Sequence, residues 1–210
     1  MTPLDTGEII PSVFAVKDGY VNLFLIKGST GYIAVDTGKD KKIVSRELKQ
    51  LKINPDDVKA VFLTHSDFDH TGAVDIFSKA RIFLAQPEER LVTGKIRRFR
   101  IKKNSLNCRH ELLQDGEEPV IDGLRIKCIL TPGHTPGSMC FLVDGKYLFC
   151  GDSMSLKAGK VHVFNNIFNM DSELQKKSLK KLAGLSGPEM LVTAHYGCTE
   201  DVSNAFSGLN

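Results

Sequence analysis

Short apolar strands that end in histidine or aspartate recur along this chain. The run VKAVFLT (58–64) leads into THSDFDHTG (64–72), and later apolar runs lead into TPGHTPGS (131–138), CGDS (150–153) and TAHYG (193–197). Histidines that serve only to fill a core lie within elements and do not recur at strand exits. The pattern therefore predicts one site that is assembled from several strand ends.

The stretch THSDFDHTG places four ligand-type side chains close together. His65 and Asp67 point to the same side of an extended chain, and Asp69 and His70 are expected to begin the next helix. The alternative is that both aspartates are helix caps and the histidines are incidental. His134, Asp152 and His195 at the other strand ends favour the ligand interpretation.

The rest of the chain alternates strands with helices in two halves. Strands followed by helices, twice over, predict two sheets in a sandwich with helices outside, and the length of 210 residues suits one domain over 1–210. Helices are expected at 39–53, 72–80, 171–185 and 200–206, with Asp171 or Ser172 capping the third. Strands are expected at 13–17, 20–28, 31–38, 58–64, 81–85, 119–123, 124–133, 138–145, 146–152 and 189–197.

The composition of the chain argues against several classes of protein. The chain has no run of eighteen apolar residues and no visible signal peptide. Its five scattered cysteines form no CxxC pair, which favours a reducing cytoplasm. The net charge of +3 is small, so the chain is not expected to bind nucleic acid. The basic segment KIRRFRIKK (95–103) either lines the site entrance and attracts an anionic substrate or forms a solvated edge.

The motifs THSDFDH, TPGHTPGS, GD and AHYG, preceded by VDTG at 35–38, occur in an order that resembles the metallo-β-lactamase superfamily. The resemblance covers nearly the whole chain. It implies an α+β fold, a four-layer αββα sandwich of two mixed sheets flanked by helices. It also implies two divalent metal ions: one held by His65, Asp67 and His134, the other by Asp69, His70 and His195. Asp152 would bridge them, and Asp36 would orient ligands.

Asp67 departs from the common HxHxDH pattern of that family. Each metal would then have two imidazoles and one carboxylate of its own, together with Asp152. Zinc remains the expected metal, but this ligand set also suits iron or manganese. The flavodiiron branch carries a carboxylate at the same place, so a di-iron redox enzyme without its flavodoxin domain is an alternative. A non-enzymatic metal-binding module is a third.

The expected reaction is hydrolysis. A hydroxide held between the metals would attack an ester, thioester, lactone or phosphodiester of a small substrate, with Asp69 holding the hydroxide in line. Tyr196 either contacts substrate or packs beside its turn. Phe164 and Phe168 either wall the pocket or fill the core. His162 is expected to be an ordinary strand histidine, and His110 to be structural or on the surface.

Overall fold

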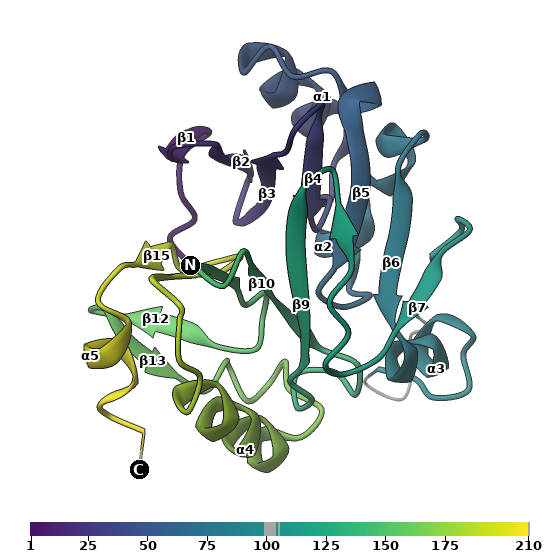
Figure 1. Ribbon diagram of the computed structural model, residues 1–210. Helices are drawn as coiled ribbons and strands as arrows, with labels where there is room; N and C mark the ends of the chain where they lie inside the picture. The colour runs from purple at the N-terminus through teal and green to yellow at the C-terminus, as the bar shows by residue number, and fades with distance from the viewer. Residues whose placement is uncertain (99–103, 105, 210) are drawn as a thin grey trace.

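The computed structural model describes residues 1–98, 104 and 106–209, and these form two large mixed sheets (Figure 1). In the described residues the first sheet has the strand order β1-β2-β3-β4-β5-β6-β7. Strands β1 to β4 pair antiparallel, and β4 to β7 pair parallel. The strands are β1 (Gly7–Ile10), β2 (Val13–Asp18), β3 (Val21–Lys27), β4 (Tyr32–Val35), β5 (Val58–Leu63), β6 (Arg81–Ala85) and β7 (Glu111–Leu113).

The second sheet comes from the other half of the chain and has the order β15-β14-β11-β10-β9-β8 over the described part. Only β11 and β14 pair parallel there. A separate ribbon joins β12 (Ser155–Lys157) and β13 (Lys160–His162). The sheet strands are β8 (Val120–Ile121), β9 (Leu124–Leu130), β10 (Met139–Val143), β11 (Tyr147–Phe149), β14 (Met190–Val192) and β15 (Cys198–Thr199).

Helices cover the outer faces of the two sheets. Helix α1 (Lys41–Gln50) packs Val44 and Leu48 on the first sheet, and α4 (Ser172–Ala183) packs Leu179 and Leu182 on the second. The Asp171 side chain accepts a hydrogen bond from the Leu174 amide, so the expected cap of α4 is confirmed. The shorter helices are α2 (Phe68–Thr71), α3 (Glu89–Val92), α5 (Val202–Phe206) and the 3₁₀ turns η1 (Pro55–Asp57), η2 (Val74–Phe77) and η3 (Gln86–Glu88).

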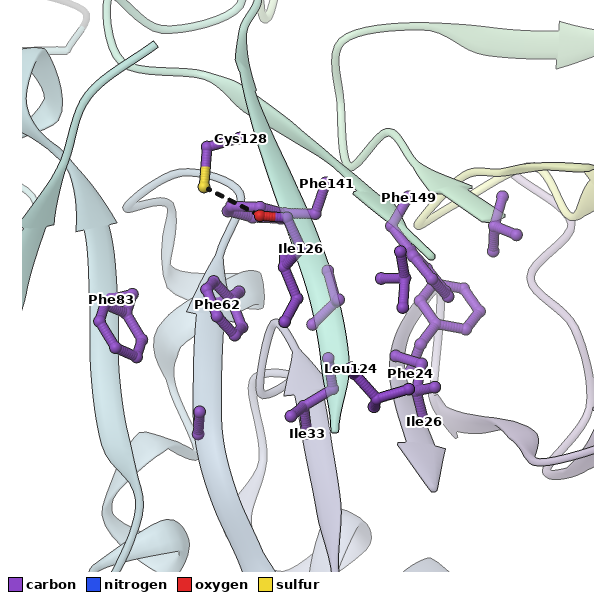
Figure 2. Close-up of a cluster of buried hydrophobic side chains, with 14 of the residues drawn as sticks. Phe24, Ile26, Ile33, Phe62, Phe83, Leu124, Ile126, Cys128, Phe141 and Phe149 are labelled. Atoms are coloured by element: carbon purple, nitrogen blue, oxygen red, sulfur yellow. Dashed lines mark hydrogen bonds between the residues drawn. The ribbon is translucent and has the colours of Figure 1, made fainter. Parts of the chain in front are cut away.

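The main core lies between the two sheets (Figure 2). Successive residues of β5 alternate faces: Ala60 and Phe62 point to this core, whereas Val61 and Leu63 point toward α1. The Phe62 ring stacks on Phe83 from its own sheet, with centroids 4.8 Å apart, and meets Phe141 from the opposite sheet at 5.3 Å. Truncating such a ring typically costs about 3–5 kcal/mol. The predicted αββα sandwich is confirmed.

The helix expected at 72–80 is wrong. Instead, α2 ends before Gly72, and the chain continues as the 3₁₀ turn η2. The helical conformation is interrupted at Ala73, which has a φ of −104° and a ψ of 15°, so 72–80 does not form one regular helix. Val74 and Phe77, three residues apart, both reach the core from the tighter turn. Short strands β1, β7, β12, β13 and β15 were also not predicted.

Strand direction gathers the motifs at one edge of the sandwich. Because β4 and β5 are parallel, Asp36 and Thr64 leave the first sheet side by side. Because β11 and β14 are parallel, Asp152 and His195 leave the second sheet together. Among the described residues, no helix has the length and apolar character needed to cross a membrane.

Candidate metal centre

The loop after β5 brings His65 and Asp67 to the edge where the two sheets meet. Asp67 precedes α2 in an extended conformation, with φ −66° and ψ 148°, but its side chain does not cap the helix. Its carboxylate instead faces His65 and His134. The interpretation of Asp67 as a simple cap is therefore wrong. Asp69 and His70 lie in α2, as expected.

The TPGHTPGS turn packs tightly enough to require its glycines. Gly133 has a φ of +145°, and a Cβ there would lie 2.4 Å from the Cα of Gln175 in α4. A Cβ at Gly137 would lie 2.4 Å from the backbone nitrogen of Glu88. Close packing on both sides thus fixes where His134 enters the site.

All four motif histidines direct Nε2 into the site because Nδ1 is held from behind. In metal sites such contacts fix the imidazole tautomer and the ring orientation. The Nδ1 partners are Thr64 Oγ1 for His65 at 3.0 Å, Asp36 Oδ2 for His70 at 2.7 Å, Asn169 Oδ1 for His134 at 3.2 Å and the Tyr20 carbonyl oxygen for His195 at 2.8 Å.

Asp36 connects two of these contacts. It has a φ of +62°, and its Oδ1 accepts hydrogen bonds from the Thr64 amide at 2.8 Å and the Thr64 hydroxyl at 3.0 Å. Thr64 in turn contacts His65, while Asp36 contacts His70 directly. These are the contacts expected of a residue that orients site histidines.

We name His65, Asp67 and His134 the first subsite. Asp67 Oδ2 lies 3.5 Å from His65 Nε2 and 3.3 Å from His134 Nε2. Ligands about 2.0–2.1 Å from a tetrahedral zinc ion lie about 3.3 Å from one another. The donor atoms of the first subsite thus already have the spacing of a metal polyhedron.

We name Asp69, His70 and His195 the second subsite. Asp69 Oδ2 lies 3.6 Å from His195 Nε2 and 3.9 Å from His70 Nε2. Asp152 lies between the subsites: its Oδ2 is 3.4 Å from His134 Nε2, and its Oδ1 is 3.1 Å from His195 Nε2. The structure thus brings all seven ligand candidates together, and the position of Asp152 fits a bridging role.

Buried polar atoms at this place lack partners of their own. Among the described residues, His65 Nε2 and His70 Nε2 have no hydrogen-bond partner, although both side chains are fully buried. A buried unsatisfied acceptor typically costs about 1–3 kcal/mol. A cation among these atoms would remove that cost, so the residues present fit a metal.

Charges couple the groups strongly. Burial alone would lower the pKa of His70, but the carboxylates of Asp36, Asp152 and Asp69 raise it to about 10. Burial likewise disfavours ionised Asp152, yet the neighbouring histidines His195, His70 and His134 hold its pKa below the usual value. Asp152 is therefore kept ionised, as metal ligation requires.

Glu88, which the sequence reading missed, joins the two loops of the first subsite. Its buried Oε1 accepts hydrogen bonds from the Ser66 amide at 2.9 Å and hydroxyl at 2.6 Å. Its Oε2 accepts from the Thr135 hydroxyl at 2.7 Å and the Gly137 amide at 2.9 Å. Glu88 follows the carboxyl end of β6 at the same sheet edge, and that position was the available signal.

Arg98, from the basic segment, and Asn104, which was not predicted as a site residue, contact Asp67. Arg98 is 4% exposed, and its Nη2 lies 3.0 Å from Asp67 Oδ2. The Asn104 amide donates to Asp67 Oδ1 at 2.9 Å. The interpretation of the basic segment as a solvated edge is right for Lys95 and Arg97, which are exposed. It is wrong for Arg98, which is buried. Residues 99–103 of the basic segment lie outside the described residues.

The subsites open into a cavity of about 350 Å³. Tyr20, Phe164 and Phe168 line it together with site residues, so the two phenylalanines do form a wall. Tyr196 packs against Phe164 with ring centroids 5.9 Å apart and is not among the lining residues. A larger cavity of about 520 Å³, beside Cys108 and η2, has none of the motif residues in its lining.

The remaining two histidines lie outside the metal site, as predicted. His162 ends β13 on the surface. His110 pairs with Glu89 at 2.8 Å, and neither residue lines the 350 Å³ cavity. Six histidines thus divide into four at the site and two elsewhere.

A family model supports what the site geometry indicates. The model of the Metallo-beta-lactamase superfamily matches residues 16–195, which include all seven ligand candidates. This chain belongs to the metallo-beta-lactamase superfamily. A metallo-beta-lactamase family protein from Thermus thermophilus has the same fold, with a TM-score of 0.71 and 24% identity over 94% of this chain and 77% of its own.

Curated relatives from this superfamily include hydrolases. The chain is 31% identical over 130 residues to a probable polyketide biosynthesis zinc-dependent hydrolase, PksB, of Bacillus subtilis, which covers 60% of this chain and 51% of PksB. It is 28% identical over 187 residues to a hydroxyacylglutathione hydrolase of Serratia proteamaculans, covering 88% of this chain and 64% of that enzyme. The matched region thus spans about half to two thirds of these relatives.

Proposed function

We propose that this chain is a metal-dependent hydrolase of small substrates, with zinc as the preferred metal. The observation that carries the proposal is the convergence of four Nε2 atoms and three carboxylates at the mouth of one cavity. Metal ions bound there would polarise a carbonyl or phosphoryl group and lower the pKa of water toward about 7. The relatives that are named as a zinc-dependent hydrolase and as a hydroxyacylglutathione hydrolase agree with this chemistry.

Asp69 is the residue we assign to proton handling. Its side chain is about one fifth exposed, in contrast to the buried histidines, and it lines the cavity. A carboxylate at that place can accept a hydrogen bond from the attacking water and hold it toward the substrate.

The cavity favours substrates with an apolar portion. Tyr20 and Phe168 are 43% and 40% exposed and line it, while Phe164 forms its buried floor. Exposed apolar groups around a polar site typically mark a ligand surface. An ester, thioester or lactone with a hydrocarbon acyl group fits this wall better than a phosphodiester does.

A hydrolysis screen tests the proposal. Acyl esters, acyl thioesters, lactones and a phosphodiester are offered to the wild type and to His134→Ala, and metal is measured on protein purified without added metal. Hydrolysis by the wild type alone, with bound zinc, is the expected result. Bound iron with oxygen-sensitive colour and no hydrolysis would favour the redox alternative.

Free thiols on all five cysteines support our further proposal of a cytoplasmic location.

A further inference from the structure

Arg98 places a positive charge on the donor atoms of the first subsite. Its Nη2 lies 3.0 Å from Asp67 Oδ2 and 3.1 Å from His134 Nε2. These are the same two atoms that lie 3.3 Å apart and would bind a metal there. The guanidinium therefore uses the electron pairs that a metal ion would need.

The guanidinium is held in this position by further contacts. Its Nη1 donates to the His134 carbonyl oxygen at 3.0 Å, and its Nη2 also donates to the Phe168 carbonyl oxygen. Asn104 holds the other carboxylate oxygen of Asp67 and bonds to Ser66 Oγ at 2.8 Å. Arg98 is nearly completely buried. A buried arginine with several acceptors is a built part of the site and not a passing surface contact.

The second subsite adjoins an anion instead. Its outer partner is the carboxylate of Asp36, which contacts His70 at 2.7 Å. Glu88, the carboxylate behind the first subsite, bonds to Ser66, Thr135 and Gly137 and not to the ligand side chains. In direct contact with ligand side chains, the second subsite therefore has an anion that attracts a dication, whereas the first has a cation that repels it.

We propose that Arg98 is an internal cation that competes with metal for the first subsite. The chain then binds one divalent ion tightly in the second subsite, and a further ion only when Arg98 leaves Asp67. This inference rests on the ligand set of the proposed function but not on the reaction itself.

The test is a zinc titration of the full, chelator-treated chain by calorimetry and elemental analysis. The wild type should bind one zinc tightly and a second at least about tenfold more weakly. Arg98→Met, which keeps the apolar stem, should tighten the second binding step about 10- to 100-fold, the range for outer contacts of metal ligands. Arg98→Lys should keep that step weak. Arg97→Met removes an adjacent exposed charge and should change nothing.

Two results would overturn the proposal. One is a wild type that binds two zinc ions with equal affinity; the other is an Arg98→Met variant whose second step is unchanged or weaker. The wild-type titration decides by itself if the variant does not fold. Histidine ring NMR adds a check, because His70 and His195 should respond to the first equivalent and His65 and His134 only to the second. A protein that shows this order but hydrolyses nothing would refute the proposed function and leave the role of Arg98 intact.

Discussion

The two subsites contain the same ligand types but lie in opposite electrostatic surroundings. Each has two histidines and one aspartate, yet Arg98 adjoins the first and Asp36 adjoins the second. The pKa values of the histidines also differ between the subsites. Burial lowers the pKa of His134, whereas carboxylates overcome burial and raise the pKa of His70 to about 10. Ligand identity alone therefore does not set the behaviour of a metal subsite, because the neighbouring charges differ.

The largest effect is expected from Asp69→Ala in the second subsite. Loss of its carboxylate should lower kcat about 10²- to 10⁴-fold on any substrate that the wild type cleaves, as for other positioned proton acceptors. Asp67→Ala is the matched change in the first subsite and should cost less. Steady-state kinetics measure both, with thermal unfolding to show that each variant still folds cooperatively. Near-full activity of Asp69→Ala would show that its assigned role is wrong.

The next effect is a difference in pH dependence between the subsites. Below pH 10, zinc must displace a proton from His70, so affinity for the second subsite should rise about tenfold per pH unit toward that value. His134 has a pKa below its ordinary value of about 6.5, so it imposes no such slope on the first subsite above that pH. Calorimetry in buffers of different ionisation heat counts the released protons. Equal slopes for the two binding steps would remove this distinction.

A matched pair of outer substitutions should act mainly on different subsites. Glu88→Gln weakens the link between the two loops of the first subsite, and Asp36→Asn removes the charge behind His70. Each should reduce metal affinity about 10- to 100-fold at its own subsite. Asp36→Asn should also weaken the first subsite to a smaller degree, because Asp36 holds Thr64 behind His65. The stepwise zinc titration separates the two effects. If Asp36→Asn weakens the first subsite as much as Glu88→Gln does, the subsites do not act separately.

The smallest effect is expected from Asp67→His, which restores the common family pattern. An imidazole in place of the carboxylate should shift metal preference from manganese or iron toward zinc. Because Asp67 contacts Arg98, this change and Arg98→Met should not be additive. Competition binding with paired metals measures the preference. An unchanged preference would mean that Asp67 does not coordinate.

Most of the fold could be predicted from the sequence because strand and helix signals are local. The long strands β3, β5, β9 and β10 were expected, as were α1 and α4 with the cap at Asp171. The prediction failed at 72–80, where the backbone leaves the helical conformation at Ala73 and continues as a 3₁₀ turn. It also missed two-residue strands such as β15, which form only because a neighbouring strand supplies hydrogen bonds.

The sequence by itself determined which side chains gather, because each ligand candidate lies in a segment that begins where an apolar strand ends. Only the tertiary structure decided what surrounds them. Nothing in the run KIRRFR distinguishes Arg98, which turns inward, from Arg97, which stays in solvent. Glu88 likewise gains its role from loops that meet only after the two sheets pack. Contacts between segments distant along the chain depend on packing, and local sequence patterns do not record them.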